Sequence, residues 1–63
     1  MEYPELKAKF LKTYDSVPEP LRDEIITALG TETFTWRTAK VEIERDTPSA
    51  KKIIAQLHQL QVI

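Results

Sequence analysis

The sequence predicts one α+β domain over residues 1–63, with an N-terminal helix, a β-hairpin and two C-terminal helices. Two segments begin with proline and carry apolar residues at steps of three and four, which is typical of helices. Between them, the only glycine separates two runs rich in β-branched and aromatic residues, which indicates a hairpin. An all-α bundle of three or four helices is the alternative, because the middle of the chain also fits a helix.

The first helix is expected over residues 4–16. Proline at its start is favourable, since the N–H that proline lacks is not needed in the first turn. Leu6, Phe10 and Thr13 or Tyr14 then recur on one face. Two prolines follow the segment and end the helix, because residues before proline avoid the α region.

Residues 21–36 fit two structures. In a helix, Gly30 would serve as the C-terminal cap. In a hairpin, residues 24–29 and 33–36 are the strands, and Gly30 lies in the turn, where positive φ is usually needed. The residue types favour the hairpin, preceded by a short helical turn over residues 20–23.

Residues 35–45 are also ambiguous. The run 40–44 alternates like a strand, which leaves a three-stranded meander open. However, Thr35 is a suitable N-cap, and Trp36 and Ile43 after it fit helical spacing. Because most residues of the run are better helix formers than strand formers, we expect a helix.

The last helix is expected over residues 48–60. Thr47 is its N-cap and Pro48 its first residue, which together are a strong start signal. One face of this helix carries Ile53, Ile54, Leu57, Leu60 and Gln61, and Ala50 extends the face. The core of the whole domain is expected to form around Phe10, Ile25, Trp36, Ile53 and Leu57.

Composition excludes several classes of protein. The chain has no cysteine, so it has neither disulfides nor zinc–thiolate sites, and self-association is the open route to extra stability. Nine basic residues against ten acidic ones give no global attraction to nucleic acid or to anionic lipid. No apolar run can span a bilayer, and residues 1–5 lack the features of a signal peptide, so we expect a cytoplasmic protein without membrane contact.

Catalytic chemistry has no support in the sequence. His58 is the only histidine and is expected at the edge of the last helix, half in water. No Gly-x-Ser-x-Gly motif or glycine-rich phosphate loop is present, and the carboxylates do not have the spacing of a calcium loop. We therefore expect no enzyme, no catalytic or metal-binding residues and no cofactor.

Candidate contact residues for nucleic acid or a protein partner gather in the last two segments. Aromatic side chains interleaved with arginine can stack on bases, although a single tryptophan in so small a domain also suits the core. The candidates are Trp36, Arg37, Lys40, Lys51 and Lys52.

The stretch from Trp36 to Ile63, with Ala39, Ile43, Ile53, Leu57 and Leu60 as buried positions and a closing Leu-x-Val-Ile, resembles the helix-turn-helix part of winged-helix proteins. The resemblance implies that the second helix enters the major groove of DNA. The matching contact positions are Ser49, Lys51, Lys52 and Gln56. The turn lacks the usual glycine, and three carboxylates near it, Glu42, Glu44 and Asp46, would repel phosphates.

The run Asp23-Glu24-Ile25-Ile26 and the pair Thr35-Trp36 also resemble a class of short uncharacterised prokaryotic proteins, a resemblance that implies no activity. The sequence thus favours a non-enzymatic module that binds a protein partner or itself. A small DNA-binding regulator is the alternative.

Overall fold

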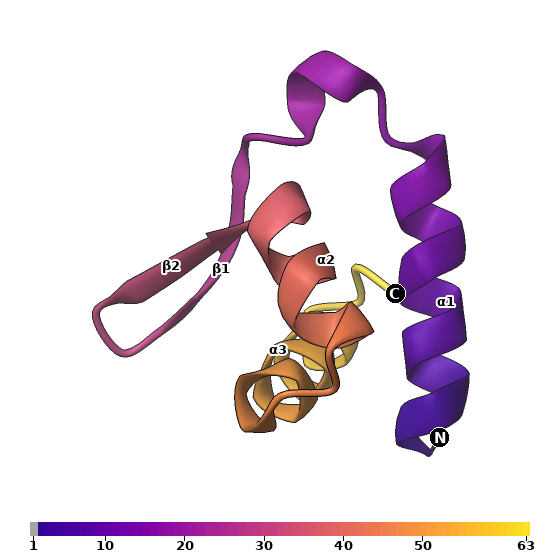
Figure 1. The fold of residues 1–63 in the computed structure, drawn as a ribbon, viewed down its shortest axis with the longest axis vertical. Helices are drawn as coiled ribbons and strands as arrows, with labels where there is room; N and C mark the ends of the chain where they lie inside the picture. Colours follow the sequence, from indigo (N-terminus) through magenta and orange to yellow (C-terminus); the bar gives the residue numbers. More distant parts are fainter. Residues whose placement is uncertain (1) are drawn as a thin grey trace.

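Three helices pack together, and a two-stranded hairpin projects from them (Figure 1). The computed structural model describes residues 2–63, so Met1 lies outside the described part of the chain. A helix is followed by a short 3₁₀ turn, two antiparallel strands and two further helices. The α+β prediction is therefore confirmed, and the all-α alternative is wrong.

Helix α1 spans Tyr3–Ser16. Glu2 caps its start, because the Glu2 backbone N–H donates to the Glu5 carboxylate at 3.4 Å. The helix ends where the chain becomes extended before a proline, as predicted. Its buried side chains lie one turn apart and are Leu6, Phe10 and Tyr14.

A 3₁₀ turn, η1, at Glu19–Leu21 begins one residue before the helical turn predicted over residues 20–23 and ends two residues earlier. Strands β1 (Ile25–Leu29) and β2 (Glu32–Thr35) follow it and pair in antiparallel register. Gly30 is the first of the two turn residues and has a φ of 64°. Positive φ at this position is typical of a type II′ turn, whose twist matches that of the strands.

Ile25 was predicted to be part of the core, but this prediction is wrong, because Ile25 is 63% exposed. The pairing register shifts between Ile25 and Thr27, which makes Ile26 the extra residue of a bulge. Because side chains alternate across a strand, the bulge turns Ile25 to the outer face, and Ile26 packs against the core instead. The sequence places two isoleucines side by side and does not show which of them faces inward.

Helices α2 (Trp36–Glu44) and α3 (Pro48–Gln59) begin at the predicted caps. Thr35 Oγ1 accepts a hydrogen bond from the Thr38 N–H at 3.1 Å, and Thr47 Oγ1 accepts one from the first turn of α3 at 3.2 Å. The cap at Thr35 ends the second strand. Trp36 was predicted to be the last residue of that strand, but it is the first residue of α2.

Both C-terminal helices end in Schellman motifs that lack glycine. After α2, Asp46 has a φ of 52°, and the N–H groups of Asp46 and Thr47 donate to the carbonyls of Ile43 and Glu42 at 3.2 and 3.3 Å. After α3, Gln61 has a φ of 61°, and the same two bonds return to residues 58 and 57. The left-handed conformation costs roughly 1–2 kcal/mol for a residue with a Cβ, and the captured carbonyls offset that cost.

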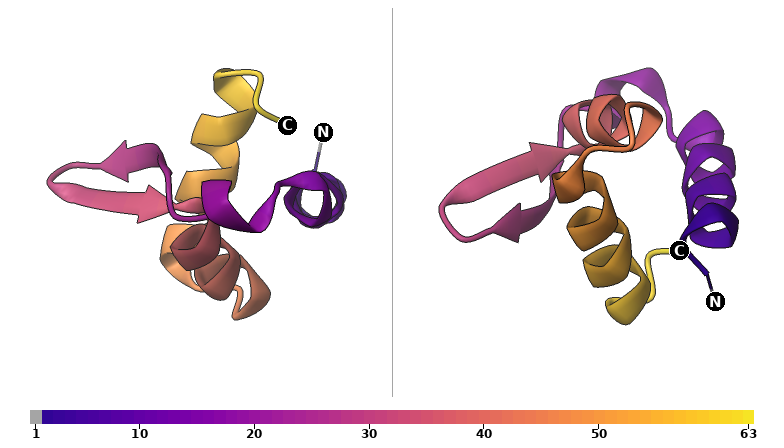
Figure 2. Two further views of the ribbon diagram at one scale, coloured as in Figure 1. Left: turned by 90° about the horizontal axis from the view of Figure 1, so that it is seen from above. Right: turned by 60° about the horizontal axis from the view of Figure 1, so that its bottom comes forward.

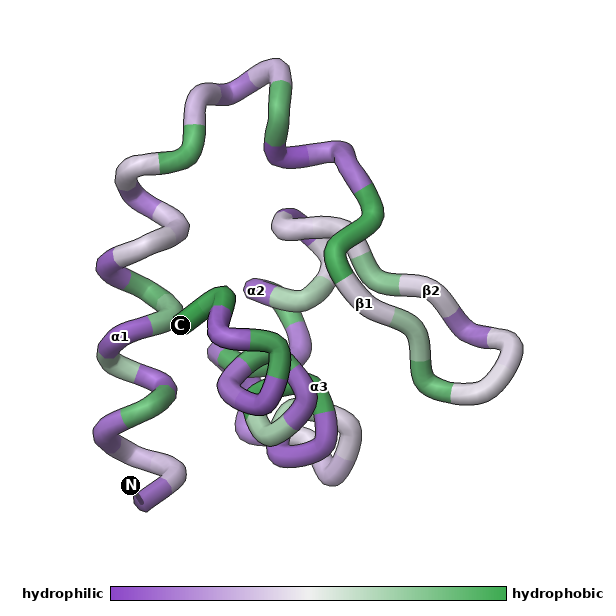
Figure 3. Tube along the Cα trace, turned by 180° about the vertical axis from the view of Figure 1, so that it is seen from behind, coloured by the Kyte–Doolittle hydropathy of each residue, from purple (hydrophilic) through white to green (hydrophobic). Residues whose placement is uncertain are grey.

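The second of these motifs turns the chain back, so that the C-terminus lies beside α1 (Figures 1 and 3). Ile63 packs against the core as a result. Leu60 was predicted to be buried, but it is 58% exposed, because α3 ends one residue earlier than predicted and the turn carries Leu60 outward.

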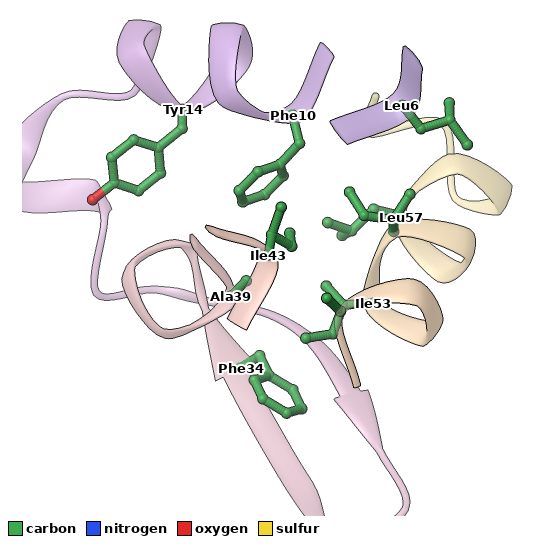
Figure 4. Close-up of a cluster of buried hydrophobic side chains, with 10 residues drawn as sticks. Leu6, Phe10, Tyr14, Phe34, Ala39, Ile43, Ile53 and Leu57 are labelled. Carbon is green, nitrogen blue, oxygen red and sulfur yellow. The ribbon is translucent and has the colours of Figure 1, made fainter. Parts of the chain in front are cut away.

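One core joins the helices to the base of the hairpin (Figure 4). Helix α3 contacts α1, α2 and β1, and helix α2 contacts α1, α3 and β2. The buried apolar residues are Leu6, Phe10, Tyr14, Phe34, Ala39, Ile43, Ala50, Ile53, Ile54 and Leu57. Three of the five predicted core residues are among them, and Trp36 packs at the edge of the core. No helix within residues 2–63 has the length and apolar character needed to cross a membrane.

Candidate interaction surfaces

Trp36, the candidate for base stacking, lies half-buried at the start of α2. Its ring stacks on Phe10 of α1, with ring centroids 5.7 Å apart and an angle of 26° between the planes. Stacked aromatic pairs at this distance contribute about 0.5–1.5 kcal/mol beyond the area that they bury. The ring that could stack on a base is therefore already used to hold α2 against α1.

Arg37 follows Trp36 and connects α2 to the η1 turn. Its guanidinium donates to Glu19 at 2.7 Å and to Asp23 at 2.9 Å, and its backbone N–H donates to the Arg22 carbonyl at 3.0 Å. The hydrogen bonds from the guanidinium to Asp23 and Glu19 raise the pKa of Arg37, and the bond from Arg37 lowers the pKa of the Glu19 carboxyl. A phosphate that approached Arg37 would have to compete with two carboxylates.

Tyr14, which the sequence did not single out, receives two cations. The Arg22 guanidinium lies 4.3 Å from the centre of the Tyr14 ring, and Lys40 Nζ lies 5.0 Å from it. Lys40 also pairs with Glu44 at 3.6 Å, and Arg22 donates to the Val17 carbonyl at 3.0 Å. The Lys40–Glu44 pair is an i,i+4 contact, whereas Lys40 and Tyr14 are 26 residues apart, so no local sequence signal indicates their contact.

Asp46 forms a second polar link at the other end of α1. Its Oδ1 accepts hydrogen bonds from Lys7 Nζ at 2.8 Å and from the Tyr3 hydroxyl at 3.0 Å. The bond from Lys7, followed by that from Tyr3, lowers the pKa of the Asp46 carboxyl, and the charge of Lys51 adds to the effect. Burial and the hydrogen bond to Asp46 raise the pKa of Tyr3. The hydrogen bonds to this carboxylate thus link α1 to the turn between α2 and α3.

Lys51 and Lys52 are in a different situation, because both are exposed on α3. Neither forms an ion pair within the described residues. Ser49 and Gln56, the other two positions implied by the helix-turn-helix resemblance, are half-buried. The five candidate residues therefore lie in two groups: three are engaged with α1, η1 or α2, and two face solvent.

The hairpin is a further surface that the sequence did not single out. Its tip extends clear of all three helices in different views (Figures 1 and 2). Within residues 2–63 each strand pairs only with the other, so both outer edges are unpaired there. The outer face presents Ile25, Ala28 and Thr33, all exposed and uncharged.

Nothing in residues 2–63 brings together three or more side chains suited to a metal ion, and no pocket is found on the surface that these residues form. Comparisons of the chain with protein-family models, with curated proteins and with solved structures find no match.

Proposed function

We propose that the chain is a non-enzymatic interaction module that acts by self-association. The projecting hairpin carries this proposal: residues 25–35 include one charged side chain, Glu32, and neither strand pairs with a third strand in the part of the chain that the structure describes. Unpaired strand edges accept further strands, and soluble proteins usually protect such edges with charge. A two-stranded ribbon is only marginally stable by itself, so added strands would stabilise its tip.

The size of the chain supports the same proposal. A domain of about 60 residues buries only about 60% of the surface that its unfolded chain exposes, so its stability is marginal. A second copy could cover apolar side chains that the monomer leaves in water. The large exposed apolar residues are Leu21, Ile25, Val41, Leu60 and Val62.

Sedimentation equilibrium over micromolar to millimolar concentrations tests self-association. We expect the apparent mass to rise from the monomer value of 7.3 kDa toward twice that value. A mass that stays at 7.3 kDa up to the highest concentration would refute the proposal.

Charge distribution favours a second candidate function, DNA binding through α3. From Thr47 to Ile63 the side chains include Lys51 and Lys52 and no carboxylate. A helix face with exposed lysines and no acidic side chain attracts phosphates. The helix-turn-helix resemblance assigns contact with DNA to the same helix.

Titration of duplex DNA at low salt, followed by amide chemical shifts, tests this second candidate. We expect shifts along α3, and weaker binding for Lys52→Glu than for Lys12→Glu, a matched charge reversal at an exposed position of α1. Binding should also weaken steeply as salt is added. If no amide resonance moves, DNA binding is refuted.

A further inference from the structure

Backbone groups in the middle of the hairpin are available to another strand. In an antiparallel pair, residues alternate between those that bond across the ladder and those whose N–H and C=O point outward. Leu29 and Glu32 flank the two-residue turn and form a hydrogen-bonded pair. In the next pair, Ala28 and Thr33, the backbone N–H and C=O groups therefore point away from the partner strand. Both Ala28 and Thr33 are exposed. Each edge therefore has one N–H and one C=O that point away from the partner strand.

The two edges differ in how far they continue. On β2, the Thr35 N–H already donates to Thr38 Oγ1 at 2.8 Å, and α2 begins at the next residue. On β1, five residues without any charge form the strand, and its bulge is confined to the end nearest the helices. Residues 27–29 are regular and lead into the tip that projects beyond the helices (Figure 2). Within residues 2–63 the β1 edge is thus the longer of the two unpaired edges, and α3 contacts β1 as α2 contacts β2.

We infer that a second copy of this chain pairs with β1, edge to edge and antiparallel about Ala28, to form a four-stranded sheet in the order β2-β1-β1-β2. This inference rests on the proposed self-association and names the surface responsible for it. In this register Ala28 lies opposite Ala28 of the copy, and Thr27 lies opposite Leu29 of the copy. The N–H of each Ala28 then donates to the C=O of the other Ala28 across the two-fold axis.

Charge and symmetry favour a copy of the chain as the occupant. Because β1 is uncharged, no like charges meet across the axis, and the one charged residue of the hairpin, Glu32, lies a strand away on β2. The small Ala28 side chain leaves room at the axis, where the two copies come closest. A two-fold interface also closes on itself, so it yields a dimer and not a fibre.

Proline substitutions at matched positions test the inference. Ala28→Pro removes the outward N–H of β1, and Thr33→Pro removes the equivalent N–H of β2; proline is tolerated at strand edges where the N–H faces solvent. We expect Ala28→Pro to weaken dimerisation by about thirtyfold, because the symmetric pair loses two hydrogen bonds. Thr33→Pro should dimerise like the wild type, and far-UV circular dichroism should show that both variants fold.

A second measurement on the unmodified chain keeps the test independent of the variants. Hydrogen exchange at the Ala28 amide should slow as the protein concentration rises, while exchange at Thr33 should not change. If the wild type is monomeric, both the proposed function and this inference are refuted. If it is a dimer that Ala28→Pro does not weaken, or whose Ala28 amide stays unprotected, only the β1 edge is refuted and another surface mediates self-association.

Discussion

Replacement of Thr27 by valine should stabilise the fold, because the threonine hydroxyl is buried without a partner. Thr27 is 6% exposed, and its Oγ1 is the one buried side-chain oxygen or nitrogen within residues 2–63 that has no hydrogen bond. An unpaired buried hydroxyl costs about 1–3 kcal/mol in mutational studies. Valine has nearly the same shape and the same β-branching, so it fills the same space and keeps the preference for a strand. We expect a gain of about 1 kcal/mol, at the lower end of that range, since small adjustments can relieve part of the cost.

Urea and thermal unfolding, followed by circular dichroism, measure this gain. For a domain of this size, 1 kcal/mol corresponds to a rise in Tm of about 4–8 °C. Thr27→Ser is the matched control: it keeps the hydroxyl and loses a buried methyl, so it should destabilise the fold by about 1 kcal/mol. A valine variant no more stable than the wild type would show that the hydroxyl is hydrogen-bonded after all, and the reasoning would fail.

Four further predictions follow from single positions. Gly30→Ala should cost about 1 kcal/mol in urea unfolding, because φ is 64° there, whereas D-alanine in a synthetic chain should not. Leu57→Ala empties a fully buried site and should cost about 2–5 kcal/mol, enough to populate unfolded chain in circular dichroism. Gln61→Gly relieves a left-handed residue and should raise stability in urea by about 0.5–1 kcal/mol. Two hydrogen bonds lower the pKa of Asp46, so their stabilisation is complete above about pH 4 and is lost as the pH falls through the folded-state pKa. The stability difference between wild type and Asp46→Asn should therefore shrink in acid, and a constant difference would contradict the role of that carboxylate.

Local chemistry made most of the fold predictable. Proline at a first turn and threonine at an N-cap act within a few residues, so the starts of the helices could be predicted from sequence alone. The single glycine located the hairpin turn for the same reason. The residue types of the two ambiguous runs also decided correctly between strand and helix in the middle of the chain.

Errors arose where one residue's placement depends on distant packing. The bulge that exposes Ile25 is selected by the fit of Ile26 against the core, which no local pattern encodes. Leu60 continues the apolar period of α3, but the helix ends before it and the chain turns back, so that Ile63 contacts the core instead. In both cases the apolar residues recur at the expected spacing, but the geometry at the end of the strand or helix turns the side chain toward solvent.

Candidate contact residues were harder to assess, because a basic residue in the sequence does not show what neutralises it. Arg37 meets Glu19 and Asp23, which precede it by 18 and 14 residues, and the fold alone brings these groups together. Lys40 is likewise engaged, with Glu44 and the ring of Tyr14. Among the five candidates, Lys51 and Lys52 alone form no contact of this kind within residues 2–63, so the DNA-binding hypothesis depends on them.

The number of exposed lysines on α3 links the two candidate functions. Two lysines per chain neutralise about two phosphates, so a monomer on duplex DNA should show a slope of log K against log salt concentration of only about −2. So small a slope corresponds to weak binding at physiological salt. A dimer that presents two α3 helices would double the slope to about −4. The two proposals together therefore predict that self-association through the hairpin raises DNA affinity, and we expect Ala28→Pro to reduce the salt slope as well as dimerisation.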